Sequence, residues 1–179
     1  MSGAIHSLWF KPTGPAFNVL ADVVDRLARE LGASPFEPHV TLLGNLEGSQ
    51  REILWRSEAL ARKLRRFEIE LTEPAYGQEH FQCVFMRVKE TPSVMGANSR
   101  ARPVFGQAPG GYLPHLSLVY GSFPDARKRE IIARLPDLRL SFEAAAVHVI
   151  RADTDDPKNW HELAAFPIED DRVAMARRS

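Results

Sequence analysis

The chain has 179 residues, of which 44% are hydrophobic and 26% charged, a balance that excludes a disordered or fibrous protein. Its 23 basic and 23 acidic side chains give a formal charge of zero, which argues against a large basic surface for long nucleic acid. Cys83 is the single cysteine and cannot form an internal disulfide, so we expect a cytoplasmic protein. The uncharged stretch 103–124 is broken by four prolines and four glycines and predicts no membrane span.

Hydrophobic periodicity predicts alternating short strands and amphipathic helices. The expected strands, in chain order, are residues 4–10, 39–43, 67–71, 81–88, 116–120, 138–142, 146–151 and 162–166. The expected helices are residues 17–31, 49–65, 91–101 and 125–135, and a capping box at 49–52 opens the second. No regular βαβ period links them, so we predict an α+β fold with largely antiparallel sheets. We expect one domain over residues 1–168 and a flexible polar tail over 169–179.

One short motif occurs twice. Pro38–Leu43 reads proline, histidine, aliphatic, hydroxyl, leucine, aliphatic, and Pro114–Val119 repeats this order. Each copy is followed by a turn and a helix, and the two histidines are 76 positions apart. Two halves of similar size, each with its own copy, indicate a pseudo-two-fold architecture.

The repeat predicts a pair of histidines that share one cleft. Side chains in a strand alternate between its two faces, so His39 and Thr41 point the same way, as do His115 and Ser117. The aliphatic residues between them face the core. If the pseudo-dyad sets the two strands side by side, two imidazoles and two hydroxyls converge.

That set of groups suits a phosphodiester. Opening a cyclic phosphate needs a base for the attacking water and an acid for the leaving alkoxide, and histidine can serve as either near neutral pH. The hydroxyls can donate to the phosphate oxygens, where charge accumulates in the transition state. The sequence does not say which histidine is the acid. We expect no cofactor and no metal, because no zinc-like ligand spacing occurs.

The two motifs resemble those of the two-histidine (2H) phosphoesterase superfamily, and more narrowly of the cyclic phosphodiesterases of the plant and fungal type. Further segments follow the family's order, and the similarity covers about residues 4–168. These segments are His6–Trp9, Phe81–Phe85, Thr91–Met95, Gly111–Tyr120, and Asp153–Asp155 with Trp160.

The resemblance implies a bilobal fold, with two antiparallel sheets that flank a central cleft and helices outside. It implies hydrolysis of nucleoside 2',3'-cyclic phosphates and ADP-ribose 1'',2''-cyclic phosphate. The residues that it assigns are His39 and His115 as the catalytic pair, Thr41 and Ser117 as phosphate-binding hydroxyls, and Tyr120 and Trp9 as substrate contacts.

Two other functions remain open at this point. The same four residues could process RNA ends, which would need a basic groove leading from the cleft. The cleft could also hold phosphorylated nucleotides without catalysis. In each case we expect a monomer whose partner is a small cyclic nucleotide or a short RNA end, and no membrane. His6 and His148 lie on expected strands outside the repeat, His80 is expected at the surface or a strand end, and His161 is expected to be structural. Cys83 is expected in the core.

Overall fold

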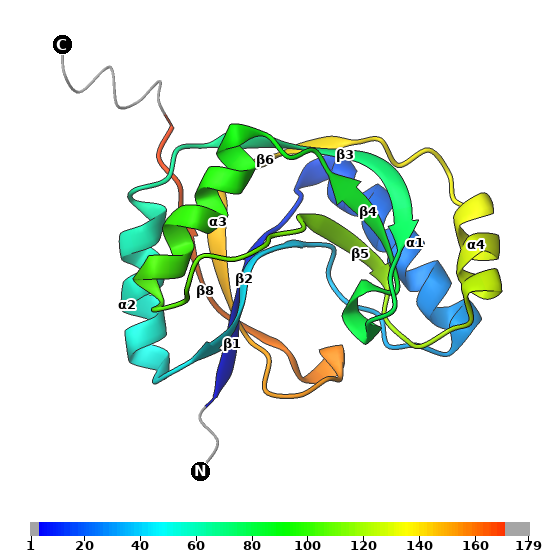
Figure 1. Cartoon of the computed structure of the whole chain (residues 1–179), viewed down its shortest axis with the longest axis horizontal. Coiled ribbons are helices and arrows are strands. Elements are labelled where there is room, and N and C mark those ends of the chain that lie inside the picture. Colours follow the sequence, from blue (N-terminus) through cyan, green and yellow to red (C-terminus); the bar gives the residue numbers. More distant parts are fainter. Residues whose placement is uncertain (1–3, 171–179) are drawn as a thin grey trace.

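The computed structural model describes residues 4–170 and has an α+β architecture (Figure 1). The described strands are β1 (Ile5–Phe10), β2 (Val40–Glu47), β3 (Phe67–Tyr76), β4 (Val84–Val88), β5 (His115–Val119), β6 (Ser141–Ala144), β7 (Ala146–Arg151) and β8 (His161–Pro167). The helices are α1 (Gly14–Leu31), α2 (Gln50–Ala61), α3 (Pro92–Val104) and α4 (Asp125–Ala133), with short 3-10 helices η1 (His80–Gln82) and η2 (Pro157–Asn159). Each strand and helix expected from the sequence has a counterpart.

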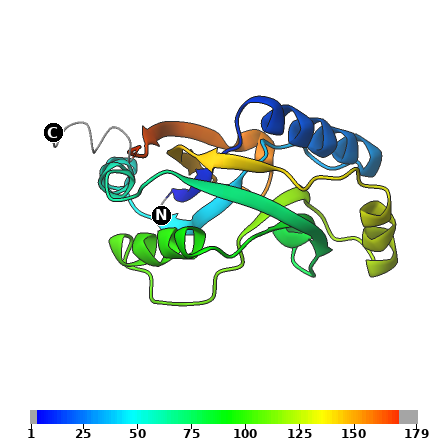
Figure 2. The same ribbon diagram turned by 90° about the horizontal axis from the view of Figure 1, so that it is seen from above.

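The strands form one curled sheet in the order β6-β3-β4-β5-β2-β1-β7-β8, and every neighbouring pair is antiparallel. The antiparallel α+β fold is therefore confirmed. The expectation of two separate sheets was wrong, because β2 and β5 hydrogen-bond across the middle and join the two halves. Figures 1 and 2 show the helices on the outside of this curled sheet.

The order of elements is repeated on either side of the β2–β5 junction. One unit runs β1, α1, β2, α2, and the other runs β4, α3, β5, α4. Helix α1 packs against β5 and α3 packs against β2, so each helix crosses to the strand of the other unit. Helix α2 packs on β7 and β8, and α4 packs on β3 and β4. These contacts are the pseudo-two-fold arrangement that the repeated motif indicates.

Local sequence sets the helix ends. Gly32 closes α1 in the left-handed conformation at φ 65°, which a side chain would disfavour. Ser49 caps α2, and its hydroxyl accepts from the backbone N–H of Glu52 at 3.3 Å. Thr91 caps α3 in the same way, and Pro92 starts the first turn, where no backbone donor is needed.

The expected strand over residues 81–88 is wrong at its start, where η1 replaces it. Gly77 lies so close to this turn that a β-carbon there would be 2.7 Å from the carbonyl oxygen of Gln82. The buried ammonium of Lys128 donates to the Gly77 carbonyl at 2.7 Å and fixes the turn from helix α4. These are long-range contacts that a local pattern does not contain.

The convex side of the sheet holds the core. Val40, Leu42, Leu116 and Leu118 are fully buried, as the alternation of the two motif strands predicts. Cys83 is also buried and is a free cysteine, which confirms its expected place in the core.

The described residues contain no helix that is both long enough and apolar enough to cross a bilayer. Of the predicted tail, Glu169 lies in a bridge with Arg65, and residues 171–179 fall outside the described part of the chain.

Replacing Lys128 with methionine should lower the free energy of unfolding by about 1–3 kcal/mol, because the Gly77 carbonyl loses its charged donor. Urea denaturation measures the change. The matched control is Arg62→Met, which breaks an exposed pair between Glu58 of α2 and the residue that follows the helix and should leave the midpoint unchanged. Equal midpoints for wild type and Lys128→Met would contradict the anchoring of η1.

Candidate active site

The register of the central strands brings the two motifs together. Val40 pairs with Leu116 in the antiparallel β2–β5 ladder. One step away on either side, His39 lies level with Ser117, and Thr41 lies level with His115. All four side chains therefore share the concave face, opposite to the buried aliphatic residues.

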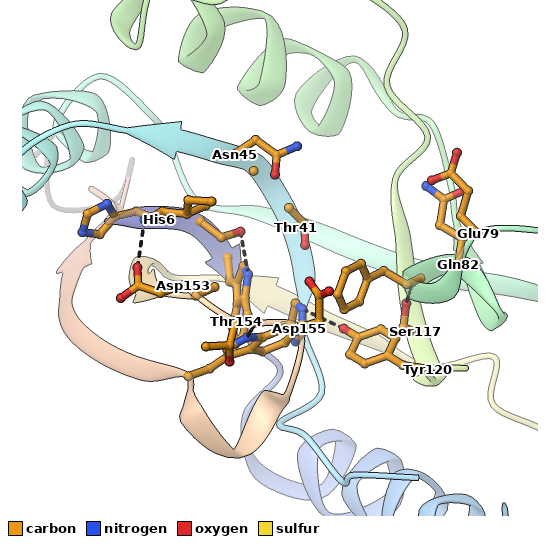
Figure 3. Close-up of a pocket in the computed structure, with 18 of the residues that line it drawn as sticks. His6, Thr41, Asn45, Glu79, Gln82, Ser117, Tyr120, Asp153, Thr154 and Asp155 are labelled. Atoms are coloured by element: carbon orange, nitrogen blue, oxygen red, sulfur yellow. Dashed lines mark hydrogen bonds between the residues drawn. The ribbon is translucent and has the colours of Figure 1, made fainter. Parts of the chain in front are cut away.

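A cavity of about 350 Å³ opens on this concave face, and both halves of the sheet contribute to it (Figure 3). The half that contains β2 supplies Trp9, His39, Thr41, Asp153, Asp155 and Trp160, and the half that contains β5 supplies Glu79, Phe81, Gln82, His115, Ser117 and Tyr120. All six residues that the sequence assigned to the site thus line one cavity. Their roles in a reaction stay predictions.

Both histidines are oriented by the same backbone device. Nδ1 of His39 lies 2.6 Å from the carbonyl oxygen of Glu37, and Nδ1 of His115 lies 2.8 Å from that of Leu113. A carbonyl oxygen only accepts, so each Nδ1 carries the proton and each Nε2 is left for other partners. A proline follows each of these carbonyl residues and restricts it to extended backbone, which helps to aim the carbonyl.

His39 sits in an aromatic enclosure. Its ring stacks on Trp9 with centroids 3.5 Å apart and planes 7° apart, while Phe36 and Trp160 approach edge-on. Only 5% of the residue is exposed. This burial lowers the pKa of His39 to about 3, and the nearby charges of His115 and Lys11 act in the same direction. The free protein therefore holds His39 neutral.

His115 is less enclosed than its counterpart. It is half-buried and meets the edge of Phe85 with centroids 5.0 Å apart. Burial lowers its pKa as well, and the bond to the Leu113 carbonyl opposes that effect. The two imidazoles thus share a backbone geometry but differ in their exposure to water.

Three hydroxyls complete the inner part of the cavity. Ser117 donates to the carbonyl of Phe81 at 2.9 Å. Tyr120 stacks on Phe36, and its hydroxyl lies 3.5 Å from Nε2 of His39. Burial raises the pKa of Tyr120, so this hydroxyl stays protonated and can donate. Thr41 lies on the opposite side of the cavity in Figure 3 and has no side-chain hydrogen bond to a described residue.

The mouth of the cavity combines aromatic rings with carboxylates. Phe81 is 38% exposed and stands 6.0 Å from Trp160 across the mouth, measured between ring centroids. Figure 3 shows Glu79 at one end and Asp153 at the other. No lysine or arginine lines the cavity among residues 4–170, while Glu79, Asp153 and Asp155 do. Sequence reasoning missed Phe81 in this role, because the ring falls within an expected strand and only its exposure distinguishes it.

Of the remaining histidines, only His6 lines the same cavity within residues 4–170. His6 is fully buried with neither ring nitrogen hydrogen-bonded, and it lies on β1 between Ile5 and Ser7. His80 is exposed in η1 beside the Tyr120 ring, and His148 pairs with Glu162. Within the described residues, no group of three or more histidine, cysteine, aspartate and glutamate side chains is arranged to hold a metal ion.

Two His-x-hydroxyl strands that lie side by side and point their side chains into one cavity, in a curled antiparallel sheet with outer helices, define a two-histidine phosphoesterase. The sequence comparison narrows this class. The chain belongs to the family described as "Cyclic phosphodiesterase-like protein", whose model matches residues 4–147.

The names of individual relatives agree with this family assignment. "Cyclic phosphodiesterase" of Arabidopsis thaliana is 25% identical over 168 residues, which span 89% of this chain and 93% of the relative. "2',3'-cyclic-nucleotide 3'-phosphodiesterase" of Yarrowia lipolytica is 28% identical over 175 residues, which span 73% and 81%. A crystal structure of E. coli LigT complexed with 3'-AMP has the same fold, with TM-score 0.63, 15% identity, and coverage of 92% of this chain and 98% of LigT.

His39 should stay in its neutral Nδ1–H form as the pH falls from about 8 to about 5, because its pKa in the folded protein is about 3. Nitrogen-15 NMR of the imidazoles measures this, with the urea-unfolded chain as the control that titrates near the reference value of about 6.5. The lowered pKa means that His39 stabilises the fold fully above about pH 6.5 and loses that contribution as the pH falls toward 3. A protonated His39 at pH 6 in the folded protein would contradict the conclusion that burial in the aromatic enclosure keeps this ring neutral.

Proposed function

We propose that the chain hydrolyses cyclic phosphodiesters, with nucleoside 2',3'-cyclic phosphates and ADP-ribose 1'',2''-cyclic phosphate as candidate substrates, and releases phosphomonoesters. The observation that carries the proposal is the pair of imidazoles in one cavity, each with Nδ1 on a backbone carbonyl. That arrangement makes both Nε2 atoms available for proton transfer. The names of the Arabidopsis and Yarrowia relatives support the same reaction.

The reaction needs one neutral and one protonated imidazole. The neutral ring takes a proton from water as the water oxygen attacks phosphorus. The protonated ring gives its proton to the ribose oxygen as the P–O bond breaks, so that the product is a monoester. The negative charge of the bound cyclic phosphate raises the proton affinity of the pair, which allows one ring to be charged in the complex. Each transfer is typically worth about 10²–10⁴-fold in rate.

The other groups bind and orient the phosphate and the nucleoside. Thr41 and Tyr120 supply hydroxyl donors for the non-bridging oxygens, where charge grows in the transition state. The single proton of the Ser117 hydroxyl becomes a third donor when it turns from the Phe81 carbonyl to the phosphate. The exposed Phe81 and the half-buried Trp160 supply aromatic surface at the mouth, suited to a nucleobase. The acid, the base and the donors are all side chains of this chain, so we propose that the step needs neither metal nor cofactor.

The residues that line the cavity also bear on the oligomeric state and domain organisation of the enzyme. The cavity lining comes from the two halves of one chain, so we propose that a monomer acts as a single domain over residues 1–168, with the halves as two lobes. A cytoplasmic setting is in keeping with the lone reduced Cys83. The 3'-AMP complex of LigT supports a small nucleotide as the partner.

Replacing either His39 or His115 with alanine should lower kcat by about 10²–10⁴-fold, because each change removes one proton-transfer group. Thr41→Ala and Ser117→Ala should cost less, on the order of 10-fold to 100-fold. Turnover of several 2',3'-cyclic nucleotides and of ADP-ribose cyclic phosphate is measured in EDTA, with product identification.

The matched control is His161→Ala, an exposed histidine on β8 outside the cavity lining, which should retain wild-type turnover. Near-wild-type turnover of His115→Ala would overturn the mechanism. Tight binding of a cyclic nucleotide by the wild-type chain without any product would favour the non-catalytic binding module.

Processing of RNA ends is the competing enzymatic function, and the cavity mouth weighs against it. A strand that leads away from the cleft needs cations along its path, whereas the described lining holds three carboxylates and no lysine or arginine. Turnover of a mononucleoside cyclic phosphate should therefore exceed that of an oligonucleotide with a cyclic end. Turnover of the oligonucleotide should also lack a steep fall with added salt, and a steep fall would favour RNA processing instead.

A further inference from the structure

Lys11 forms an ionic junction with two carboxylates next to the groups that contact His39. It follows strand β1, and its side chain is only 11% exposed. Its ammonium binds the carboxylate of Glu37 at 2.5 Å and also that of Glu162. Burial alone would lower the pKa of Lys11, but the hydrogen bonds to Glu162 and Glu37 outweigh burial and raise it. The lysine is therefore charged and held between two anions.

Both of the groups that orient His39 lie next to this junction. The carbonyl oxygen of Glu37 accepts from Nδ1 of His39 at 2.6 Å, so the residue that Lys11 binds through its carboxylate also aims the imidazole. Trp9 carries the ring that stacks on His39, and the Lys11 ammonium lies 6.0 Å from the centroid of that ring. Fixing Lys11 thus restrains the hydrogen-bond acceptor and the stacking face together.

The junction also connects segments that are remote in sequence. Glu162 lies on β8, and its carboxylate is 3.1 Å from Nδ1 of His148 on β7. His148 is the register partner of Trp9 in the β1–β7 ladder. Lys11 therefore ties the end of β1, the segment before β2, and the edge strand β8 into one unit around the first motif.

Within residues 4–170, no ion pair of this kind forms at the residue whose carbonyl orients the second histidine. His115 has the same carbonyl contact, to Leu113, but Leu113 has an apolar side chain that cannot form an ion pair. The charged and titratable groups that act on His39 are His115 and Lys11, with the Tyr120 hydroxyl beside Nε2. Of these, Lys11 is the one with a fixed ionic anchorage.

We propose that Lys11 is a positioning residue for His39: through Glu37 and Glu162 it fixes the carbonyl and the indole that orient the imidazole. The consequence for turnover rests on the proposed function, whereas the effect on the imidazole does not. Misplacing a reacting group by a fraction of an ångström to an ångström is costly, so loosening this junction should reach the chemistry.

The test is Lys11→Met, which keeps an aliphatic stem and removes the charge and both ionic contacts. We expect kcat for a 2',3'-cyclic nucleotide to fall on the order of 10-fold, with KM nearly unchanged. NMR should show the pKa of His39 moving upward, because a nearby positive charge has gone. The limb of the pH–rate profile that belongs to His39 should move to higher pH, whether His39 is the acid or the base.

Three further variants separate positioning from general stabilisation. Lys11→Arg keeps the charge and should restore most of the turnover and of the His39 titration. Lys89→Met breaks a 2.7 Å pair with Glu70 outside the cavity lining and should change neither. Glu162→Gln, at an exposed position, removes one of the two anchors and should lower kcat by a smaller factor. It remains informative if Lys11→Met does not fold.

The outcomes distinguish the two proposals. If Lys11→Met folds, wild-type kcat together with an unmoved His39 titration would overturn the role of Lys11. If Lys11→Met does not fold, wild-type kcat in Glu162→Gln would overturn it. If the wild-type chain hydrolyses no cyclic phosphate, the proposed function fails, and the His39 titration in Lys11→Met alone decides whether Lys11 controls the imidazole.

Discussion

The pairing of Val40 with Leu116 is the contact on which the site depends. It joins the two halves of the sheet, and it also sets the register that puts each histidine level with the hydroxyl of the other motif. Side chains alternate along a strand, so a slip of one residue would turn one motif toward the core and leave the cavity with a single imidazole. The fully buried Leu42 and Leu118 oppose such a slip, because it would bring them out toward the cavity.

The site combines backbone symmetry with an asymmetric environment. Both imidazoles hydrogen-bond to a carbonyl two residues earlier in the chain, and a proline intervenes in each case. Around this shared frame, Trp9 and Tyr120 close over His39, while His115 keeps contact with water. A duplicated motif can thus supply two groups of one chemical kind whose affinities for a proton differ, as paired acid–base chemistry requires.

The sequence predicted the parts of the molecule that local patterns determine. The helix caps, the alternation in the two motifs and the four motif residues of the cavity could be read from spacing and residue type, whereas Tyr120 and Trp9 came from the family resemblance. The joining of two sheets into one could not, because it depends on a single register pair between strands far apart in the chain. The same holds for η1, which Gly77 and Lys128 shape from a distance, and for Lys11, whose carboxylate partners lie 26 and 151 residues away.

The carboxylates at the mouth have a consequence for the end of the catalytic cycle. A cyclic diester carries one negative charge, whereas a phosphomonoester gains a second above its second pKa of about 6. Glu79 and Asp155 make no ion pair with any described residue, so their charges act on whatever lies between them. They therefore repel the hydrolysed nucleotide more strongly than its precursor. An enzyme with such an exit is suited to rapid departure of its product and to weak product inhibition.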